Sequence, residues 1–493
     1  MSARAASATQ VRLRTGGNKF AAYDAIVIGS GPNGFSSAIT LARRGHSVLV
    51  VEGQDTIGGG LRTRELTLPG FRHDVCATVL AMTTLSPFMR SVDWGEYGVE
   101  WAVPHYPLAH PLDGGRAAVQ TTNVAGTVNR LGQDGAGWER MLGPLDAHTP
   151  ALMEDLLGPL PFPPKHPMLM AQFGVRAAFS AQLTARTLFR SEEARALFLG
   201  HAAHSILPLT KPFTSAVGSL LAASAHCTGW PVARGGSQKL GDAMARCFTD
   251  LGGEIVTGWQ VEHIDELPRA KAYLFDTSPY ALARIAASRL PAAFCDRLNA
   301  YRFGPGAFKL DLALSDPIPW AAEECRSAGT VHVCGGPDEI VASEAAAWSQ
   351  APTEKPFVLV VQPTVFDPSR APEGKHTCWA YCHVPNNATI DMAEPILAQI
   401  ERFAPGFRDT ILATHTISPG AFQGYNPNYV GGDIIGGVQD LGQMFTRPVA
   451  RWNPYTTPAR DLYICSASTP PGAGIHGMCG YFAAQAALRQ ILR

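Results

Sequence analysis

The sequence predicts an α/β fold in which a parallel-sheet domain, assembled from three chain segments, stands beside a mixed α+β domain of helices and an antiparallel sheet. Two observations carry this prediction. An apolar run at residues 25–28 leads into a glycine-rich turn at 29–34, and a second apolar run at 462–465 leads into a glycine-rich segment at 471–477. Each pattern is typical of a strand, a glycine turn and a helix. The chain is therefore expected to leave the first domain and to return near residue 490 to close it.

The first turn, with the sequence GSGPNG, matches the dinucleotide fingerprint of a Rossmann-type domain. Gly29 makes the tight turn, Gly31 lets the backbone approach a pyrophosphate, and Gly34 lets the following helix pack on the strand. A helix over residues 32–44 supplies free N–H groups for the phosphates. The contacts expected from this turn are Gly29, Ser30, Gly31, Pro32, Asn33 and Gly34.

A second parallel strand, residues 48–51, ends in Glu52, which stands 18 residues after Gly34. A carboxylate at this place accepts hydrogen bonds from both ribose hydroxyls and repels a 2′-phosphate. The segment GGGLR at 58–62 then combines a flexible backbone with a cation. It is either a second clamp on the pyrophosphate or a surface loop. With the returning C-terminal segment, these features favour a tightly held FAD over an exchangeable nicotinamide.

The remaining elements follow in chain order. Residues 90–230 are expected to form loops and helices, with a proline-rich break at 160–164 and a long amphipathic helix over 168–190. The α/β pattern then returns, and antiparallel strands and a closing strand and helix follow. The expected segments are a helix at 238–251, strands at 254–256, 260–264, 272–276, 307–314, 356–362 and 462–465, and a helix at 481–491.

The expected domain organisation alternates between the two domains. Residues 23–90, 231–300 and 441–493 form the FAD-binding domain, residues 91–230 a helical substrate region, and residues 301–440 the sheet of the substrate domain. Residues 1–22 are basic, Ser-rich and free of acids, so they are either a disordered tail or, over residues 1–20, an organelle transit peptide. The first alternative favours a cytoplasmic protein and the second a mitochondrial matrix protein.

Several blocks resemble the phytoene desaturase-like flavoproteins within the amine-oxidase-type FAD superfamily. These blocks are residues 23–74, GWPVARGGS at 229–237, FKLD at 308–311 with Pro319 and Trp320, and the stretch from Arg447 to Gly480. The resemblance covers almost the whole chain after residue 22 and is strongest to the group called pyridine nucleotide-disulfide oxidoreductase domain-containing protein 2. It implies FAD as the cofactor. Two positions depart from the superfamily pattern: Gly60 stands where Arg is usual, and Ser466 where Gly is usual.

The resemblance also suggests residues that act at the flavin. Lys309 is similar in position to a lysine of monoamine oxidases that contacts flavin N5 through water; the alternative is a solvated sheet face on which Lys309 pairs with Asp311. His476 either orients substrate and moves a proton or has a structural role, and the helix after it would direct its positive end at the flavin. Lys309 and His476 are thus the candidate catalytic residues. The cofactor contacts expected beyond the first turn are Glu52, Gly59, Gly60, Arg62, Val261, Ser468, Gly474, His476 and Gly477.

Composition excludes several other classes of protein. The net charge of −1 gives no electrostatic support for nucleic-acid binding. The ten cysteines include no Cys-x-x-Cys pair, which favours reduced thiols over a disulfide framework. His201 and His204 share a helix face but lack a third ligand, so no metal site is expected. A disulfide oxidoreductase would need a redox cysteine pair and a second nucleotide fingerprint; the glycine-rich segment 431–437 lacks that context and is expected to be a sheet corner or a loop near the flavin.

The expected function is FAD-dependent oxidation, reduction or isomerisation of a lipophilic unsaturated substrate such as a carotenoid, polyene, retinoid or fatty acid. A C–H bond would deliver hydride to flavin N5. Oxygen or a quinone would reoxidise the flavin, because no NADPH domain is visible. The alternatives are a flavin amine oxidase and a non-catalytic FAD-binding scaffold. The amphipathic pattern at 168–190 also leaves open a peripheral membrane contact, beside a core helix as its other interpretation, and a homo-oligomer is open as well.

Overall fold

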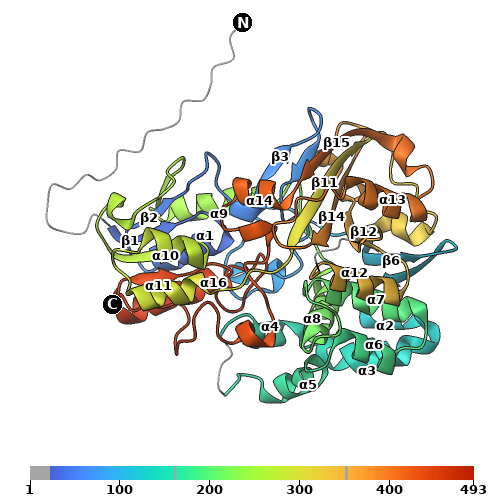
Figure 1. The fold of residues 1–493 in the computed structure, drawn as a ribbon, viewed down its shortest axis with the longest axis horizontal. Helices are drawn as coiled ribbons and strands as arrows, with labels where there is room; N and C mark the ends of the chain where they lie inside the picture. Colours follow the sequence, from blue (N-terminus) through green and yellow to red (C-terminus); the bar gives the residue numbers. More distant parts are fainter. Residues whose placement is uncertain (1–22, 160–162, 350–352) are drawn as a thin grey trace, which may run out of the picture.

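The computed structural model describes residues 23–159, 163–349 and 353–493 (Figure 1). The expected N-terminal tail and most of the expected proline-rich break, residues 160–162, lie outside these ranges. Two sheets dominate the described chain, one in each half of the molecule in Figure 1.

The first sheet is parallel, and its strands come from three separated chain segments. Within the described residues the order is β16-β10-β1-β2-β9. The bounds are β1 (Tyr23–Ile28), β2 (Val48–Val51), β9 (Glu254–Val256), β10 (Ala270–Phe275) and β16 (Leu462–Ile464). The register pairs Ile28 with both Val51 and Phe275, so the carboxyl ends of the central strands meet at one edge. The predicted three-segment Rossmann-type domain is confirmed.

Helices cover both faces of this sheet, because its central strands are apolar on both sides. One face packs against α1 (Pro32–Ala42), α9 (Gln238–Asp250) and α16 (Met478–Gln490). The other packs against α10 (Pro279–Ile285) and α11 (Ala292–Asn299). The helices α1 and α16 approach so closely that a Cβ on Gly480 would lie 1.8 Å from the carbonyl oxygen of Asn33.

The second sheet is mixed, with the order β15-β11-β14-β13-β12-β6-β7 among the residues that the structure describes. Its strands are antiparallel except for the β12–β6 pair. The bounds are β6 (Tyr106–Leu112), β7 (Arg116–Gln120), β11 (Gly306–Leu314), β12 (Ala328–Val333), β13 (Val358–Val361), β14 (His376–Val384) and β15 (Ile411–Ile417). The prediction of only loops and helices over residues 90–230 is thus wrong, because β6 and β7 lie in this range. Pro107 and Pro111 inside β6 hid the strand, because proline is unusual in a paired strand.

A helical layer covers one face of the mixed sheet (Figure 1). It consists of α2 (Val124–Arg130), α3 (Gly135–Asp146), α4 (Thr149–Leu156), α5 (Pro167–Ala177), α6 (Ala181–Leu188), α7 (Glu192–Ala203), α8 (Thr214–Thr228) and α12 (Pro337–Ala346). The expected single helix over 168–190 is two helices, because the Ser180 hydroxyl accepts a hydrogen bond from the Leu183 N–H and starts α6. On the opposite face of the sheet, α13 (Ala393–Phe403) closes a separate apolar cluster.

Short strands and turns join the two halves. The hairpin β3 (Thr63–Glu65) with β4 (Arg72–Asp74), the pair β5 (Trp101–Ala102) with β8 (Val232–Ala233), and the helices α14 (Pro419–Tyr425) and α15 (Leu441–Met444) belong here. All ten cysteines lie in the described ranges as free thiols. No described helix has both the length and the apolar composition that a membrane span requires.

Candidate cofactor site

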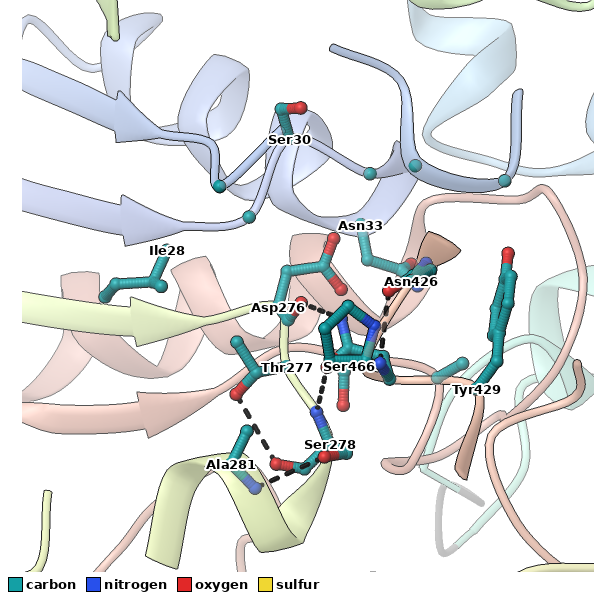
Figure 2. Close-up of a pocket in the computed structure, with 18 of the residues that line it drawn as sticks. Ile28, Ser30, Asn33, Asp276, Thr277, Ser278, Ala281, Asn426, Tyr429 and Ser466 are labelled. Carbon is teal, nitrogen blue, oxygen red and sulfur yellow. Dashed lines mark hydrogen bonds between the residues drawn. The ribbon is translucent and has the colours of Figure 1, made fainter. Parts of the chain in front are cut away.

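A cavity follows the carboxyl edge of the parallel sheet and continues toward the mixed sheet (Figure 2). Twelve predicted cofactor residues line it: Gly29, Ser30, Gly31, Pro32, Asn33, Glu52, Gly59, Gly60, Arg62, Val261, Ser468 and Gly474. Of the other predicted residues, Gly34, Gly477, His476 and Lys309 do not line this cavity. The lining thus combines all three segments of the Rossmann-type domain with residues 425–429, a loop of the second domain.

The fingerprint turn has the geometry that a phosphate cradle needs. Gly29 has a φ of +106°, and a Cβ there would lie 2.8 Å from the carbonyl oxygen of Asp276. A Cβ on Gly34 would lie 2.1 Å from the carbonyl oxygen of Gly29, so only glycine lets α1 begin this close to β1. Pro32 occupies the first turn of α1, where a missing N–H costs nothing. The N-terminus of α1 is therefore a suitable anion site on the cavity wall.

Glu52 is held at the end of β2 by four hydrogen bonds. One carboxylate oxygen accepts from the backbone N–H (3.0 Å) and the hydroxyl of Ser30; the other accepts from the Gln54 N–H (2.9 Å) and from Arg62 (3.1 Å). Its side chain keeps only a small exposed fraction, on the cavity wall where a ribose would lie. A preorganised carboxylate of this kind suits ribose hydroxyls, because it is already oriented before the ligand arrives.

Arg62 pairs with Glu52 and lines the same cavity as the fingerprint turn. Its Nε donates to the Thr56 carbonyl at 2.9 Å, and its guanidinium carbon lies 5.3 Å from the centre of the Tyr425 ring. The superfamily usually has Arg at the position of Gly60, and the structure explains why a side chain does not fit there in this chain. A Cβ on Gly60 would lie 2.7 Å from the Tyr429 hydroxyl, so the tyrosine occupies the space of a larger side chain. Tyr425 and Tyr429 both line the cavity.

The expected strand at 260–264 is wrong, and the true path of this segment forms part of the site. The backbone N–H groups of Gly258 and Trp259 donate to the carbonyls of Gln54 and Glu52, so the chain runs along the loop after β2 without pairing as a strand. Trp259, Gln260 and Val261 thereby line the cavity next to Glu52. A 3₁₀ turn at Ile264–Glu266 follows. The sequence shows Gly258 as a break but not which neighbour takes over the hydrogen bonds.

Asp276 is a cavity residue that the sequence motifs did not identify. It follows β10 directly, and its carboxylate accepts a hydrogen bond from the Gly34 N–H at 2.9 Å, at the start of α1 (Figure 2). Burial raises the pKa of this carboxyl to about 7, and the negative charge of Glu52 adds to the rise. An acidic residue immediately after a buried parallel strand was the available signal, since such positions meet at the ligand edge of the sheet.

His476 and the C-terminal glycines lie around the start of α16. The His476 Nδ1 accepts a hydrogen bond from the Met478 N–H at 3.0 Å, and its ring is fully buried. Burial lowers the pKa of His476 to about 4, so the ring is neutral at pH 7. Its neighbours Gly474 and Ile475 reach the cavity, while His476 occupies the helix end behind them. Nearby, the Ser466 hydroxyl, at the second departure from the superfamily, accepts from the Ser468 N–H at 3.3 Å.

Lys309 and Asp311 form an ion pair on β11, but the pair is buried and not on a solvated sheet face. His73 on β4 lies across from the pair, with its Nδ1 3.5 Å from a carboxylate oxygen of Asp311, and the Lys309 ammonium stands 5.7 Å from the Trp379 ring centre. His73 belongs to the hairpin β3–β4 and Trp379 to strand β14, so these elements bury the ion pair. A charge pair removed from water is costly unless both partners stay. Lys309 therefore holds Asp311 in the interior, one layer from the cavity lining.

The predicted histidine pair belongs to a neutral cluster under the mixed sheet. His204 meets His332 with 3.0 Å between their Nε2 atoms, and the His201 Nδ1 donates to the Leu197 carbonyl at 2.8 Å. Burial lowers the pKa of both His201 and His204 to about 3. Among the described residues, no three His, Cys, Asp or Glu side chains are arranged to hold a metal ion. The glycine-rich segment 431–437 is a loop whose Ile434 and Gly436 line the cavity.

Comparison with known proteins gives this geometry a family context. Residues 27–92 match the family model described as NAD(P)-binding Rossmann-like domain. The chain is 25% identical to the mouse (Mus musculus) protein called pyridine nucleotide-disulfide oxidoreductase domain-containing protein 2, over 95% of this chain and 94% of that protein. It is 26% identical to the lycopene-forming phytoene desaturase of Pseudescherichia vulneris, over 94% of this chain and 98% of that protein. The predicted resemblance to both groups is confirmed.

Solved structures share the fold over nearly the whole chain. An oxidoreductase from Methanosarcina mazei has a TM-score of 0.62 at 17% identity and covers 94% of this chain and 99% of its own. A redesigned putrescine oxidase has a TM-score of 0.60 at 16% identity and covers 94% of this chain and 98% of its own. The predicted fold class is confirmed by these matches. The sequence relatives and the Rossmann-like match, and not these folds, support the predicted FAD-dependent oxidoreductase.

The cavity residues fit FAD. The glycine cradle at the start of α1 suits a pyrophosphate, and Glu52 suits the ribose of the adenosine half. Ser468, Gly474, Tyr425 and Tyr429 also line the cavity, so its wall extends beyond the fingerprint turn and Glu52.

Proposed function

We propose that this FAD-dependent oxidoreductase acts on a lipophilic unsaturated substrate of the carotenoid, polyene, retinoid or fatty-acid type. The observation that carries the proposal is the apolar part of the cavity wall, which is backed by a packed apolar cluster between the mixed sheet and its helical layer. The cluster includes Leu359, Val361 and Tyr381 from the sheet and the inner faces of α7 and α8. Tyr425, Tyr429 and Ile434 pack against this cluster and also line the cofactor cavity. An apolar region that adjoins the cofactor cavity suits a hydrocarbon chain.

Bound FAD would supply hydride acceptance at flavin N5. The chain's residues would do the rest. The apolar side chains of Tyr425, Tyr429 and Ile434 on the cavity wall would exclude water and orient the reacting carbon by shape. The neutral histidines below the sheet add polar groups without charge, since burial keeps the pKa of His201 and His204 near 3. Desaturation, saturation and isomerisation all use this arrangement.

We also propose oxygen or a quinone as the oxidant of the reduced flavin. Among the described residues, one fingerprint turn stands at the carboxyl end of the parallel sheet, and the loop at 431–437 has no strand-turn-helix context. An NAD(P)H site of the same kind would need a second such unit.

A screen of flavin bleaching tests the substrate proposal. The holoenzyme is mixed anaerobically with polyenes, retinoids, unsaturated fatty acids and amines, and loss of the oxidised flavin absorbance is followed. We expect bleaching with at least one lipophilic polyene or fatty acid and none with the amines. Bleaching by amines alone would contradict the proposal. A flavin that neither a substrate nor photoreduction followed by oxidants can cycle would identify a non-catalytic scaffold.

The second candidate function is amine oxidation, and one observation favours it. Tyr425 and Tyr429 place two aromatic rings on the cavity wall, and an amine oxidase would use an aromatic pair to hold its substrate near the flavin. The surroundings of Tyr425 favour the lipophilic substrate, because the guanidinium carbons of Arg62 and Arg64 lie 5.3 and 5.7 Å from its ring centre. Two cations beside this ring disfavour a cationic amine at the same face.

A further inference from the structure

The carboxyl group of Asp276 occupies part of the site that a pyrophosphate needs. It accepts a hydrogen bond from the Gly34 N–H at 2.9 Å, and a Cβ on Gly31 would lie 2.7 Å from the same carboxyl oxygen. Gly31 is the fingerprint position that lets the backbone approach a phosphate, and Gly34 lies beside it in the first turn of α1. Figure 2 shows the side chain of Asp276 directed from the end of β10 toward this turn. A carboxyl group and a pyrophosphate must therefore share one helix N-terminus.

The backbone of Asp276 is fixed, so its side chain cannot leave by a small shift of the strand end. Its N–H donates to the Ile28 carbonyl at 2.8 Å, which continues the β1–β10 ladder. The carbonyl of Asp276 accepts from the Asn428 side chain at 3.4 Å, and the Asn428 side-chain oxygen accepts in turn from the Ser278 N–H at 2.8 Å. The backbone of Asp276 is thus held by β1 and Asn428, and its carboxyl group is held by the Gly34 N–H at the start of α1.

We propose that Asp276 stays at the N-terminus of α1 when FAD binds and enters the complex protonated, so that binding takes up one proton from solvent. The proton neutralises a carboxylate that would otherwise face the two negative charges of the pyrophosphate. The neutral carboxyl keeps the Gly34 hydrogen bond through its carbonyl oxygen and gains an O–H that can donate to a phosphate oxygen. This inference rests on FAD binding and is independent of the substrate.

The charged and titratable groups around Asp276 allow this coupling to be observed. Glu52 faces it from β2 and Arg62 is paired with Glu52, while Arg284 lines the cavity from α10 and pairs with Glu262. Cys465 after β16 and Cys479 on α16 are the neighbouring thiols. Burial raises the pKa of Cys479 to about 11 and that of Cys465 well above its usual value, so both stay neutral below pH 9. Tyr429 on the facing loop also stays neutral, because burial raises its pKa.

The direction of the pH effect follows from linkage. Without FAD, burial raises the pKa of Asp276 to about 7. The negatively charged pyrophosphate of bound FAD would raise this pKa further. Above the pKa without FAD, the free protein has lost the proton that the complex holds, so the FAD dissociation constant rises by up to about tenfold per pH unit. Well below it both states are protonated and affinity is flat.

Calorimetric FAD titration of the apoprotein between pH 6 and 8.5, in buffers of different ionisation enthalpy, tests the proposal. We expect about one proton taken up per FAD near pH 8.5 and almost none near pH 6. Asp276→Asn should bind FAD without proton uptake and with a nearly constant affinity over this range. Asp155→Asn is the matched control, because Asp155 is buried and accepts from backbone N–H groups of residues 165 and 166, away from the cavity. It should titrate like the unchanged protein.

The outcomes separate the proposal from the cofactor assignment. FAD binding with no proton uptake at pH 8.5 overturns the role of Asp276 and leaves FAD in place. Unchanged uptake in Asp276→Asn assigns the proton to another group and overturns it as well. If Asp276→Asn does not fold, the absence of proton uptake by the wild-type protein at pH 8.5 still overturns the proposal. No FAD binding at any pH overturns both the inference and the FAD site.

Discussion

At the scale of single residues, Glu52 connects the fingerprint turn, the second clamp and the cavity. Its carboxylate is bound by Ser30, Gln54 and Arg62 and is directed at the ribose position. We expect Glu52→Ala to weaken FAD binding at least about tenfold, because two charge-assisted hydrogen bonds of roughly 1.5 kcal/mol or more each are lost. Fluorescence titration of FAD into apoprotein measures the change. Glu65→Ala on the exposed strand β3 should leave the affinity unchanged, and an unchanged affinity in Glu52→Ala would remove Glu52 from the ribose site.

A second prediction at this scale concerns the contribution of Lys309 to stability. Because Lys309 and Asp311 are both buried, Lys309→Met leaves an unpaired carboxylate inside the protein and should cost about 3–5 kcal/mol of stability. A surface pair would have cost at most about 1 kcal/mol. Lys309→Met with Asp311→Asn removes both charges and should recover most of the loss. Thermal unfolding of the three proteins measures this.

The stable double variant also tests the predicted catalytic role of Lys309. In the double variant both charges are removed without loss of the fold. If Lys309 acts at the flavin, flavin reduction or reoxidation is nevertheless slower in this variant. Stopped-flow measurement of the two half-reactions decides. Normal rates in the double variant would leave Lys309 with a structural role only.

At the scale of elements, the close contact of α1 with α16 joins the two ends of the chain. We expect Gly480→Ala to separate these helices, because its Cβ would lie 1.8 Å from the Asn33 carbonyl oxygen and 2.2 Å from the Ser36 hydroxyl. Loss of FAD and a fall in stability beyond about 3 kcal/mol should follow, as for other overpacked cores. Gly174→Ala in α5 is the control, since no atom lies within 4 Å of its added Cβ, and it should stabilise the helix by up to about 1 kcal/mol. A Gly480→Ala protein of normal melting temperature and FAD content would contradict the packing.

Elements whose own residues determine their structure were predictable from the sequence. The strands β1, β2, β10 and β16 are short apolar runs next to glycine turns, and α1 and α9 have clear stops. Elements whose structure depends on distant partners were not. Strand β6 contains prolines and is recognisable only beside β12, and residues 257–261 follow the loop after β2 because its carbonyls are available there. The helix expected over 168–190 is interrupted by a single Ser180 cap, which periodicity alone does not reveal.

The same distinction applies to the site. The fingerprint glycines and Glu52 were recognisable from local spacing; Gly29, Gly31 and Glu52 line the cavity, and Gly34 lies next to it in the first turn of α1. Asp276 acquires its significance only from Gly34, which is 242 positions away. The segment 58–62 was expected as a clamp on the pyrophosphate or as a surface loop, and its Arg62 lines the cavity; the pairing of Arg62 with Glu52 was not predictable, because it depends on how the 3₁₀ turn at Gly59–Leu61 directs the chain.

At the scale of the whole molecule, the described residues contain one parallel sheet with one fingerprint turn at its carboxyl edge. NAD(P)H should therefore be a poor reductant of the flavin, with a rate below about 1 per second, at the low end of ordinary turnover. Stopped-flow mixing of the oxidised holoenzyme with NADH and NADPH measures it. Faster reduction would require a nicotinamide site and would contradict oxygen or a quinone as partner of the flavin.

The cofactor of the intact molecule provides the most direct test of FAD-dependent function. The purified protein is denatured, the precipitate is removed, and the supernatant is analysed for flavin by chromatography and absorbance. We predict a yellow protein that releases FAD, bound non-covalently, in a ratio approaching one per chain after reconstitution. A protein that carries no flavin, takes up none on reconstitution, or keeps it covalently attached to the precipitate would contradict this.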